Sequence, residues 1–465
     1  MLSLRQELIV TGIIFLLLFM KVGPAEYRTG VVLNLVNLLL LANLIIGFFP
    51  GPDASLFSGM FHTSRLIVLE KNMLNGATLI VSLQAYDWLK DHRHVPEFYM
   101  LLLATLTGFF FMISAGNLLM FYLGLELSTI PLAALSGFDL EKRRSSEAAM
   151  KFILSSAFSS ALLLFGISLL YGATGTLGFD TIGPRLDGSA FQLFAFILIL
   201  SGFAFKLSAV PFHLWTADVY EGSPVAVTAY LSVVSKGAVF FVFIQALYLV
   251  FRPLAGNWYR ILVLLSVLTM VVGNLFALRQ DKLKRLLAFS SIAQSGFILV
   301  GITGSSRTGE ASVIYFILVY IFSNLGAFGV VSLISAQTGK EDISDYKGLY
   351  ATNPLLSWVM AISLFSLAGI PPTAGFFGKF FLLMAGAGKR NYVFIGIAAL
   401  NMVISLYYYL RVIKAIFMDS QPEPIRPLKI PLLPNIAFVV CIAGILITGL
   451  VGWIYDYIYS LSIGF

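Results

Sequence analysis

Residues 366–383 read SLAGIPPTAGFFGKFFLL, a stretch apolar enough to lie in a membrane. The same stretch contains two adjacent prolines, Pro371 and Pro372, and a lysine, Lys379. Proline lacks the amide hydrogen that a helix needs, and a charge at the bilayer centre costs at least about 2.5–3.5 kcal/mol. A segment that carries both therefore predicts a broken transmembrane helix with a charge that serves a function.

The whole chain has the composition of a polytopic membrane protein. It has 465 residues, of which 58% are hydrophobic and 11% charged, with a mean hydropathy of +0.90; soluble proteins carry about 25% charged residues. The single cysteine, Cys441, excludes an intrachain disulfide and four-cysteine metal or iron–sulfur sites. The net charge of +7 does not indicate nucleic-acid binding, because the basic residues are spread over short loops, as membrane topology requires.

Apolar runs of about 20 residues can cross a bilayer as a helix, and the sequence predicts an all-α protein with about fourteen of them. The first run, residues 8–20, is followed by no small-residue cleavage site, so we expect a span and not a signal peptide. Lys and Arg favour one side roughly two to one, which predicts that both termini lie on the non-cytoplasmic side. The predicted spans are 7–22, 30–49, 73–89, 98–114, 117–138, 150–171, 191–217, 224–250, 259–278, 285–303, 311–335, 354–384, 392–418 and 435–460.

The chain contains an internal repeat. FKLSAVPF begins at Phe205, and the similar octapeptide FSLAGIPP begins at Phe365. The two copies fall in predicted helices 7 and 12, and an odd separation places them in opposite orientations. Inverted repeats with broken helices are the plan of many transporters. We therefore predict two inverted five-helix repeats with helices 7 and 12 broken. The predicted organisation is 1–97 for helices 1–3, 98–250 for the first repeat, 259–418 for the second and 435–465 for helix 14.

Four ionisable residues are predicted to lie deep in the membrane: Glu126, Lys206, Lys236 and Lys379. At 1.5 Å per helical residue, Lys236 lies about 22 Å from the nearest charge on either side. The alternatives are snorkelling of Lys379 to the headgroups and a structural ion pair for Glu126. Burial disfavours the charged form of an ionisable group, so such groups can gain and lose protons near physiological pH. The spacing therefore predicts proton-carrying sites.

The prolines favour water at the same depth. Pro211, like Pro371 and Pro372, frees a carbonyl one turn back, and lipid tolerates a free carbonyl only where protein or water satisfies it. We therefore expect water at both breaks, with Lys379 titrating beside it. His213 directly follows the first break; it is either a proton relay or a structural histidine.

Three longer stretches resemble a known family: HLWTADVYEGSPVAVTAYLSVVSKGA (213–238), KRLLAFSSIAQSGF (284–297) and LFSLAGIPPTAGFFGKFFLL (364–383). They are similar to the antiporter-like membrane subunits of complex I, NADH:quinone oxidoreductase, and to subunit N among them. The resemblance covers nearly the whole chain. It implies that the four deep charges are the family's proton-translocating residues: Glu126 of the fifth helix, Lys206 of the seventh, Lys236 of the eighth and Lys379 of the twelfth. Where many relatives carry a histidine, this chain has Gln294, which we expect to link Lys236 to Lys379 through water without titrating.

The resemblance also implies what surrounds the chain. It predicts a proton-translocating subunit in a bacterial inner membrane, with NADH, FMN, iron–sulfur clusters and quinone in other subunits and no cofactor in this one. The implied partners are sister antiporter-like subunits, small membrane subunits and the bilayer, and no lateral helix is expected beyond the last span. Three alternatives stay open: a subunit of a multi-subunit Na+/H+ antiporter, a subunit of a membrane-bound hydrogenase, and a structural scaffold. A photosynthetic relative that uses ferredoxin also stays open.

Overall fold

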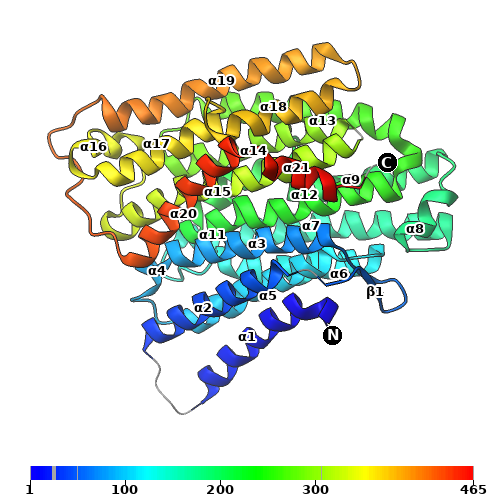
Figure 1. Ribbon diagram of the computed structural model, residues 1–465, viewed down its shortest axis with the longest axis horizontal. Helices are drawn as coiled ribbons and strands as arrows, with labels where there is room; N and C mark the ends of the chain where they lie inside the picture. Colours follow the sequence, from blue (N-terminus) through cyan, green and yellow to red (C-terminus); the bar gives the residue numbers. More distant parts are fainter. Residues whose placement is uncertain (1, 24–27, 50, 305, 464–465) are drawn as a thin grey trace.

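The computed structural model describes residues 2–23, 28–49, 51–304 and 306–463, which form a bundle of helices lying side by side (Figure 1). The first helix begins and the last helix ends toward the right of the view, where α8 and the short hairpin of β1 (Ala54–Leu56) and β2 (Phe61–Thr63) also lie. The short helices α4 and α16 lie toward the opposite end. The helices are α1 (Arg5–Val22), α2 (Thr29–Gly47), α3 (Arg65–Gln84), α4 (Tyr86–Leu89), α5 (Val95–Ile113), α6 (Leu118–Ser136), α7 (Arg143–Thr174), α8 (Phe179–Ile182), α9 (Ala190–Lys206), α10 (Leu214–Gly222), α11 (Val225–Tyr230), α12 (Lys236–Gln245), α13 (Ala255–Ala277), α14 (Leu283–Thr303), α15 (Arg307–Thr338), α16 (Leu349–Thr352), α17 (Pro354–Ala368), α18 (Ala374–Ala387), α19 (Tyr392–Phe417), α20 (Leu432–Leu450) and α21 (Trp453–Leu461).

The structure supports a polytopic membrane protein. Within the described residues, 11 helices are long and apolar enough to cross a membrane, judged by length and composition. The other predicted spans correspond to α1, which carries three charges, and to the shorter pairs α9–α10 and α17–α18. The total of fourteen spans therefore stays a prediction.

Two predicted span boundaries were wrong. The third span was expected at 73–89, but α3 begins at Arg65, because the Ser64 side chain accepts a hydrogen bond from the Ile67 amide (3.2 Å) and caps the helix. The last span was expected to be one helix over 435–460. It is two, because Val451 adopts an extended conformation between α20 and α21.

The bundle has a core of buried helices and an outer layer of helices with exposed apolar faces. Nearly all side chains of α3, α11, α12, α14 and α15 are buried, whereas α2, α7, α13, α19 and α20 each bury a smaller part of their surface. The outer face of α7, for example, exposes Leu154, Phe158 and Phe165. Charged side chains on the central helices are therefore surrounded by protein and not by lipid.

The order of the elements agrees with the predicted repeat. The two longest helices, α7 and α15, are both 32 residues long, and each ends at a glycine in the left-handed conformation, Gly175 (φ 66°) and Gly339 (φ 72°). Each is followed by a broken pair, α9–α10 and α17–α18. This agreement supports the repeat, whose inverted orientation stays a prediction.

Candidate functional site

The second break holds the ammonium group of Lys379. In a continuous helix the amides at positions 371 and 372 would bond the carbonyls of Leu367 and Ala368, but both positions are proline. Lys379, on α18, donates from Nζ to these two carbonyls, at 2.7 Å and 3.2 Å. The prolines therefore free the acceptors that bind the lysine. Lys379 is 1% exposed, so it does not snorkel to the membrane surface.

Close backbone packing keeps the two halves of this break together. The Gly375 amide donates to Ser366 Oγ (3.2 Å), and Ser323 Oγ donates to the same atom (2.7 Å). A Cβ atom added to Gly375 would lie 1.7 Å from the Ser366 carbonyl oxygen. Position 375 therefore admits glycine alone without a shift of the backbone.

Gln294 joins this break to α14. Its Nε2 donates to the Leu367 carbonyl (3.1 Å) and to the Tyr409 hydroxyl (3.2 Å). Gln294 and Lys379 therefore donate to the same backbone carbonyl, while the predicted link through water stays a prediction. Among the described residues, nothing hydrogen-bonds to the buried Oε1 of Gln294.

Lys236 contacts the same face of α14, one turn before Gln294. It follows a π-helical turn, Leu231–Ser235, a distortion that is frequent at functional sites. Its Nζ donates to Ser291 Oγ (2.6 Å) and lies 5.7 Å from the centre of the Tyr220 ring. A cavity of about 10 Å³ touches Lys236, Ser291 and Gln294, close to the smallest space that holds one water.

Lys206 and Glu126 are near each other without a direct bond. Lys206, at the end of α9, donates from Nζ to Thr129 Oγ1 (2.6 Å). Thr129 lies one turn from Glu126 on α6, on the same face. Glu126 is half-buried, and its neighbours Leu127 and Ile130 are exposed. Its carboxylate therefore lies close to the lateral surface of the bundle.

Side chains bond two backbone groups at the first break. The Trp215 indole donates to the Phe205 carbonyl (3.1 Å), and the Val210 amide donates to Thr269 Oγ1 (3.0 Å). His213 directly precedes α10, is buried and has no hydrogen bond to Nδ1 among the described residues. At the second break Lys379 bonds the carbonyls that the prolines free, and the water expected at both breaks stays a prediction.

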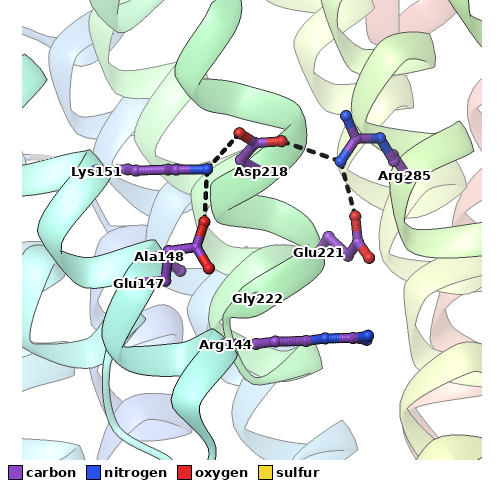
Figure 2. A pocket seen from close by; sticks show the side chains of 8 residues that line it. All are labelled: Arg144, Glu147, Ala148, Lys151, Asp218, Glu221, Gly222 and Arg285. Carbon is purple, nitrogen blue, oxygen red and sulfur yellow. Dashed lines mark hydrogen bonds and ion pairs between the residues drawn. The ribbon is translucent and has the colours of Figure 1, made fainter.

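A charged pocket of about 170 Å³ opens at the end of α10 (Figure 2). Lys151 pairs with Asp218 (2.7 Å), and Arg285 bridges Asp218 (3.0 Å) and Glu221 (2.8 Å). Burial raises the pKa of the Glu221 carboxyl, but its bonds to Lys282 and Arg285 outweigh burial and hold that pKa below its ordinary value. Tyr220, next in sequence to Glu221, places its ring below Lys236. The pocket therefore adjoins the residue that contacts the central lysine.

A second group of buried charges was not predicted. Lys71, on α3, forms an ion pair with Glu7, on α1, and both side chains are buried. Glu70 and Glu310 are buried beside them. The sequence feature that could have revealed this group is Ser64, a helix-capping residue before an apolar run. A helix that begins after Ser64 contains Lys71 two turns from its start.

The comparisons with known proteins agree on one family. A model of the family described as "NADH:quinone oxidoreductase/Mrp antiporter, TM" matches residues 115–405. The chain belongs to this family. Its matched region contains all four predicted deep charges, whereas Glu7, Glu70 and Lys71 lie outside it.

Individual members of the family cover nearly the whole chain. NADH-quinone oxidoreductase subunit N of Phocaeicola vulgatus is 45% identical over 99% of this chain and 98% of its own length. A chain of respiratory complex I from Thermus thermophilus with bound aureothin is 29% identical, with a TM-score of 0.84 over 97% of this chain and 98% of that one. A chain of the Mrp complex from Dietzia is 21% identical with a TM-score of 0.88, covering 99% of this chain and 97% of that one, and shows the fold alone.

Proposed function

We propose that this chain is the proton-translocating subunit N of a bacterial NADH:quinone oxidoreductase. The observation that carries the proposal is a nearly continuous polar connection through the buried centre. It runs from Lys236 to Ser291, past a water-sized cavity to Gln294, and on through the Leu367 carbonyl to Lys379. Subunit N of Phocaeicola vulgatus, similar over the whole length, supports the same assignment.

Protons are taken up at the charged pocket of Figure 2. The positive-inside rule places that end of the bundle on the cytoplasmic side, with both termini on the other. A pocket of about 170 Å³ has room for several waters. From there, Tyr220 contacts Lys236, the first group that holds a transferred proton. His213 serves as a side relay at the first break.

Lys236 passes its proton to Lys379, and Lys379 releases it on the far side. The Gln294 amide cannot take up a proton at neutral pH, so it orients the connecting water and fixes the Leu367 carbonyl. The carbonyls of Leu367 and Ala368 stabilise the charged form of Lys379 through their dipoles. Loss of a proton removes the charge and so weakens both hydrogen bonds.

Glu126 and Lys206 couple this path to the neighbouring subunit. Glu126 lies near the lateral surface, and the exposed apolar residues beside it fit a contact with another membrane subunit. A change of charge in the neighbouring subunit alters the electrostatic attraction between Glu126 and Lys206, on either side of Thr129. Redox chemistry with NADH, FMN, iron–sulfur clusters and quinone takes place in other subunits, and the partners are sister antiporter-like subunits and small membrane subunits.

The test is purification of the tagged chain with its partners in mild detergent, followed by reconstitution into vesicles. NADH-dependent quinone reduction with co-purifying iron–sulfur subunits supports the proposal, and Lys236→Ala then lowers the number of protons released per electron pair. Lys389→Ala is the control, because Lys389 is exposed at the end of α18. A complex of small membrane proteins without redox activity would overturn the assignment in favour of an antiporter.

A further inference from the structure

The buried charges near the start of α3 form a compact group at the end of the bundle where both termini lie. Lys71 and Glu7 are 1% and 2% exposed and form an ion pair, and the Lys71 ammonium lies 4.9 Å from the centre of the Phe61 ring. Glu70, beside Lys71 in the sequence, is 2% exposed. Burying charges in a membrane protein is costly, so such groups indicate a function.

Glu310 completes the group from the neighbouring helix α15. Its Oε2 accepts a hydrogen bond from the Ile463 amide (2.8 Å), and Arg307, one turn earlier, donates to carbonyls near the C-terminal end. Because α15 packs against α3, Glu70 and Glu310 lie buried on neighbouring helices at the same end of the bundle, with Lys71 next to Glu70 in the sequence. Two carboxylates that share a buried site cannot both stay ionised without cost, so a proton between them is favoured.

Polar atoms in this group point to water. Among the described residues, no hydrogen bond reaches Glu70 Oε2, Glu7 Oε2, Gln6 Nε2 or Asn72 Oδ1, although all four atoms are buried. Buried polar atoms in native proteins are satisfied by protein or by ordered water. Gln6 and Lys71 also line a cavity of about 10 Å³ at the end of the bundle where both termini lie. This cavity has room for about one water beside Lys71, on the side where the termini lie.

Glu70 and Glu310 lie on the helix faces that pack against α12 at Gly237, the residue after Lys236. A Cβ atom added to Gly237 would lie 3.4 Å from Leu74 on α3 and 3.3 Å from Ile317 on α15. Glu70 is four residues before Leu74 and Glu310 is seven before Ile317, so both acids share the helix faces that meet α12. At 1.5 Å per residue, Glu70 lies about 6 Å and Glu310 about 10 Å beyond that contact. The cavity beside Lys236 is lined by Gly237 and Ile317 as well.

We propose that Glu70 and Glu310 form a second proton-release site, which receives protons from Lys236 along the contact of α3, α12 and α15. The Lys236 ammonium gives a proton through water to the Glu70 carboxylate and becomes neutral. Glu70 passes the proton to Glu310 and the outer water and returns to the carboxylate. The Lys71–Glu7 ion pair keeps a fixed positive charge next to Glu70 and so positions the acceptor. This route runs in parallel with release through Lys379, and it rests on the proposed function.

The test compares proton release per electron pair in vesicles that contain the whole complex. The loss of proton release in Lys236→Ala measures the whole contribution of this chain. We expect Lys379→Met to lose only part of that share, and Lys379→Met with Glu70→Gln and Glu310→Gln to lose as much as Lys236→Ala. Asp180→Asn is the matched control, since Asp180 is an exposed acid at the same end of the bundle.

The outcomes separate the two proposals. The release site is overturned if Lys379→Met alone equals Lys236→Ala, or if the two glutamine substitutions add no loss to Lys379→Met. If Lys236→Ala itself loses nothing, the proposed function fails, and the release site fails with it.

A second measurement covers variants that do not assemble. Dicyclohexylcarbodiimide reacts with protonated carboxyl groups in apolar surroundings: the acid adds across a C=N bond, and the adduct rearranges to a stable N-acylurea. In the unmodified complex, peptide mass spectrometry should find this label on Glu70 or Glu310 and not on the ion-paired Glu7. Labelling of neither Glu70 nor Glu310 would overturn the proposal.

Discussion

Gln294 and Lys379 donate hydrogen bonds to the same atom, the carbonyl oxygen of Leu367, at 3.1 Å and 2.7 Å. The carbonyl is available because residue 371, four positions later, is a proline. One backbone oxygen therefore connects α14 to the lysine of α18. Substitutions of Gln294, Lys379 or Pro371 therefore all change the hydrogen bonding of the Leu367 carbonyl.

Gln294→Leu should lower the number of protons released per electron pair. Leucine keeps the volume but removes the donor to Leu367 and Tyr409, and it leaves the Tyr409 hydroxyl with Ser290 as its partner. Gln294→His should retain proton release, because imidazole donates a hydrogen bond and can also titrate. Gln280→Leu is the control, at a half-buried glutamine whose amide donates to the Phe276 carbonyl. Equal proton release in Gln294→Leu and Gln280→Leu would remove Gln294 from the path.

Replacing Pro371 and Pro372 together by alanine should uncouple proton release from quinone reduction. Each alanine restores an amide hydrogen that competes with Lys379 for the carbonyls of Leu367 and Ala368. A hydrogen bond from a charged donor contributes about 1.5–3 kcal/mol, so the lysine loses much of what stabilises it. The measurement is proton release per electron pair, with Pro422→Ala in an exposed loop as control. Unchanged release would mean that the break does not hold the lysine for transport.

Gly375→Ala should destabilise the chain. The new Cβ would lie 1.7 Å from the Ser366 carbonyl oxygen, so the two halves of the break must move apart. Overpacking of this kind typically costs about 1–3 kcal/mol. Gly396→Ala is the matched control: a Cβ there meets nothing within 4 Å, and alanine favours a helix interior by about 0.5–1 kcal/mol. In detergent, the midpoint of thermal unfolding should be lowest for Gly375→Ala, intermediate for the wild type and highest for Gly396→Ala. Any other order contradicts the packing argument.

Acid should weaken the charged pocket through Glu221. Its folded-state pKa lies below the ordinary value, so its contribution to stability is present above the unfolded pKa of about 4.3 and is lost as the pH falls through the folded pKa. Glu221→Gln removes this contribution at every pH. Below about pH 4.3 the thermal midpoint of the wild type should therefore approach that of Glu221→Gln. The effect is small because solvent screens the pair. If the difference between the two thermal midpoints stays constant across this pH range, ionisation of Glu221 does not contribute to stability.

The sequence was sufficient to predict that Lys206, Lys236 and Lys379 are buried, but not what they contact. Counting residues from Lys236 to the nearest flanking charges gives its depth directly, since a helix rises by a fixed amount per residue. Its partner Ser291 depends on how α12 crosses α14, which no local pattern determines. The same holds for Lys379, whose acceptors are backbone atoms of another helix.

The buried group around Lys71 was missed for a local reason. The third span was predicted to begin at 73, which placed Glu70 and Lys71 in a loop; the cap at Ser64 starts α3 earlier and carries both into the bundle. Glu7 was likewise counted at the edge of its span. Its burial comes from the packing of α1 against the rest of the bundle, which its own sequence does not reveal.

The carbonyls that hold Lys379 belong to the main chain, and this changes how the site can vary. Leucine and alanine at 367 and 368 contribute nothing chemical of their own, so other apolar residues there would present the same two oxygens. A comparison of related sequences by residue identity would therefore pass over these positions and mark the prolines instead. Grafting such a lysine site into another membrane helix would require transferring the break, not the residues whose atoms bind the ammonium.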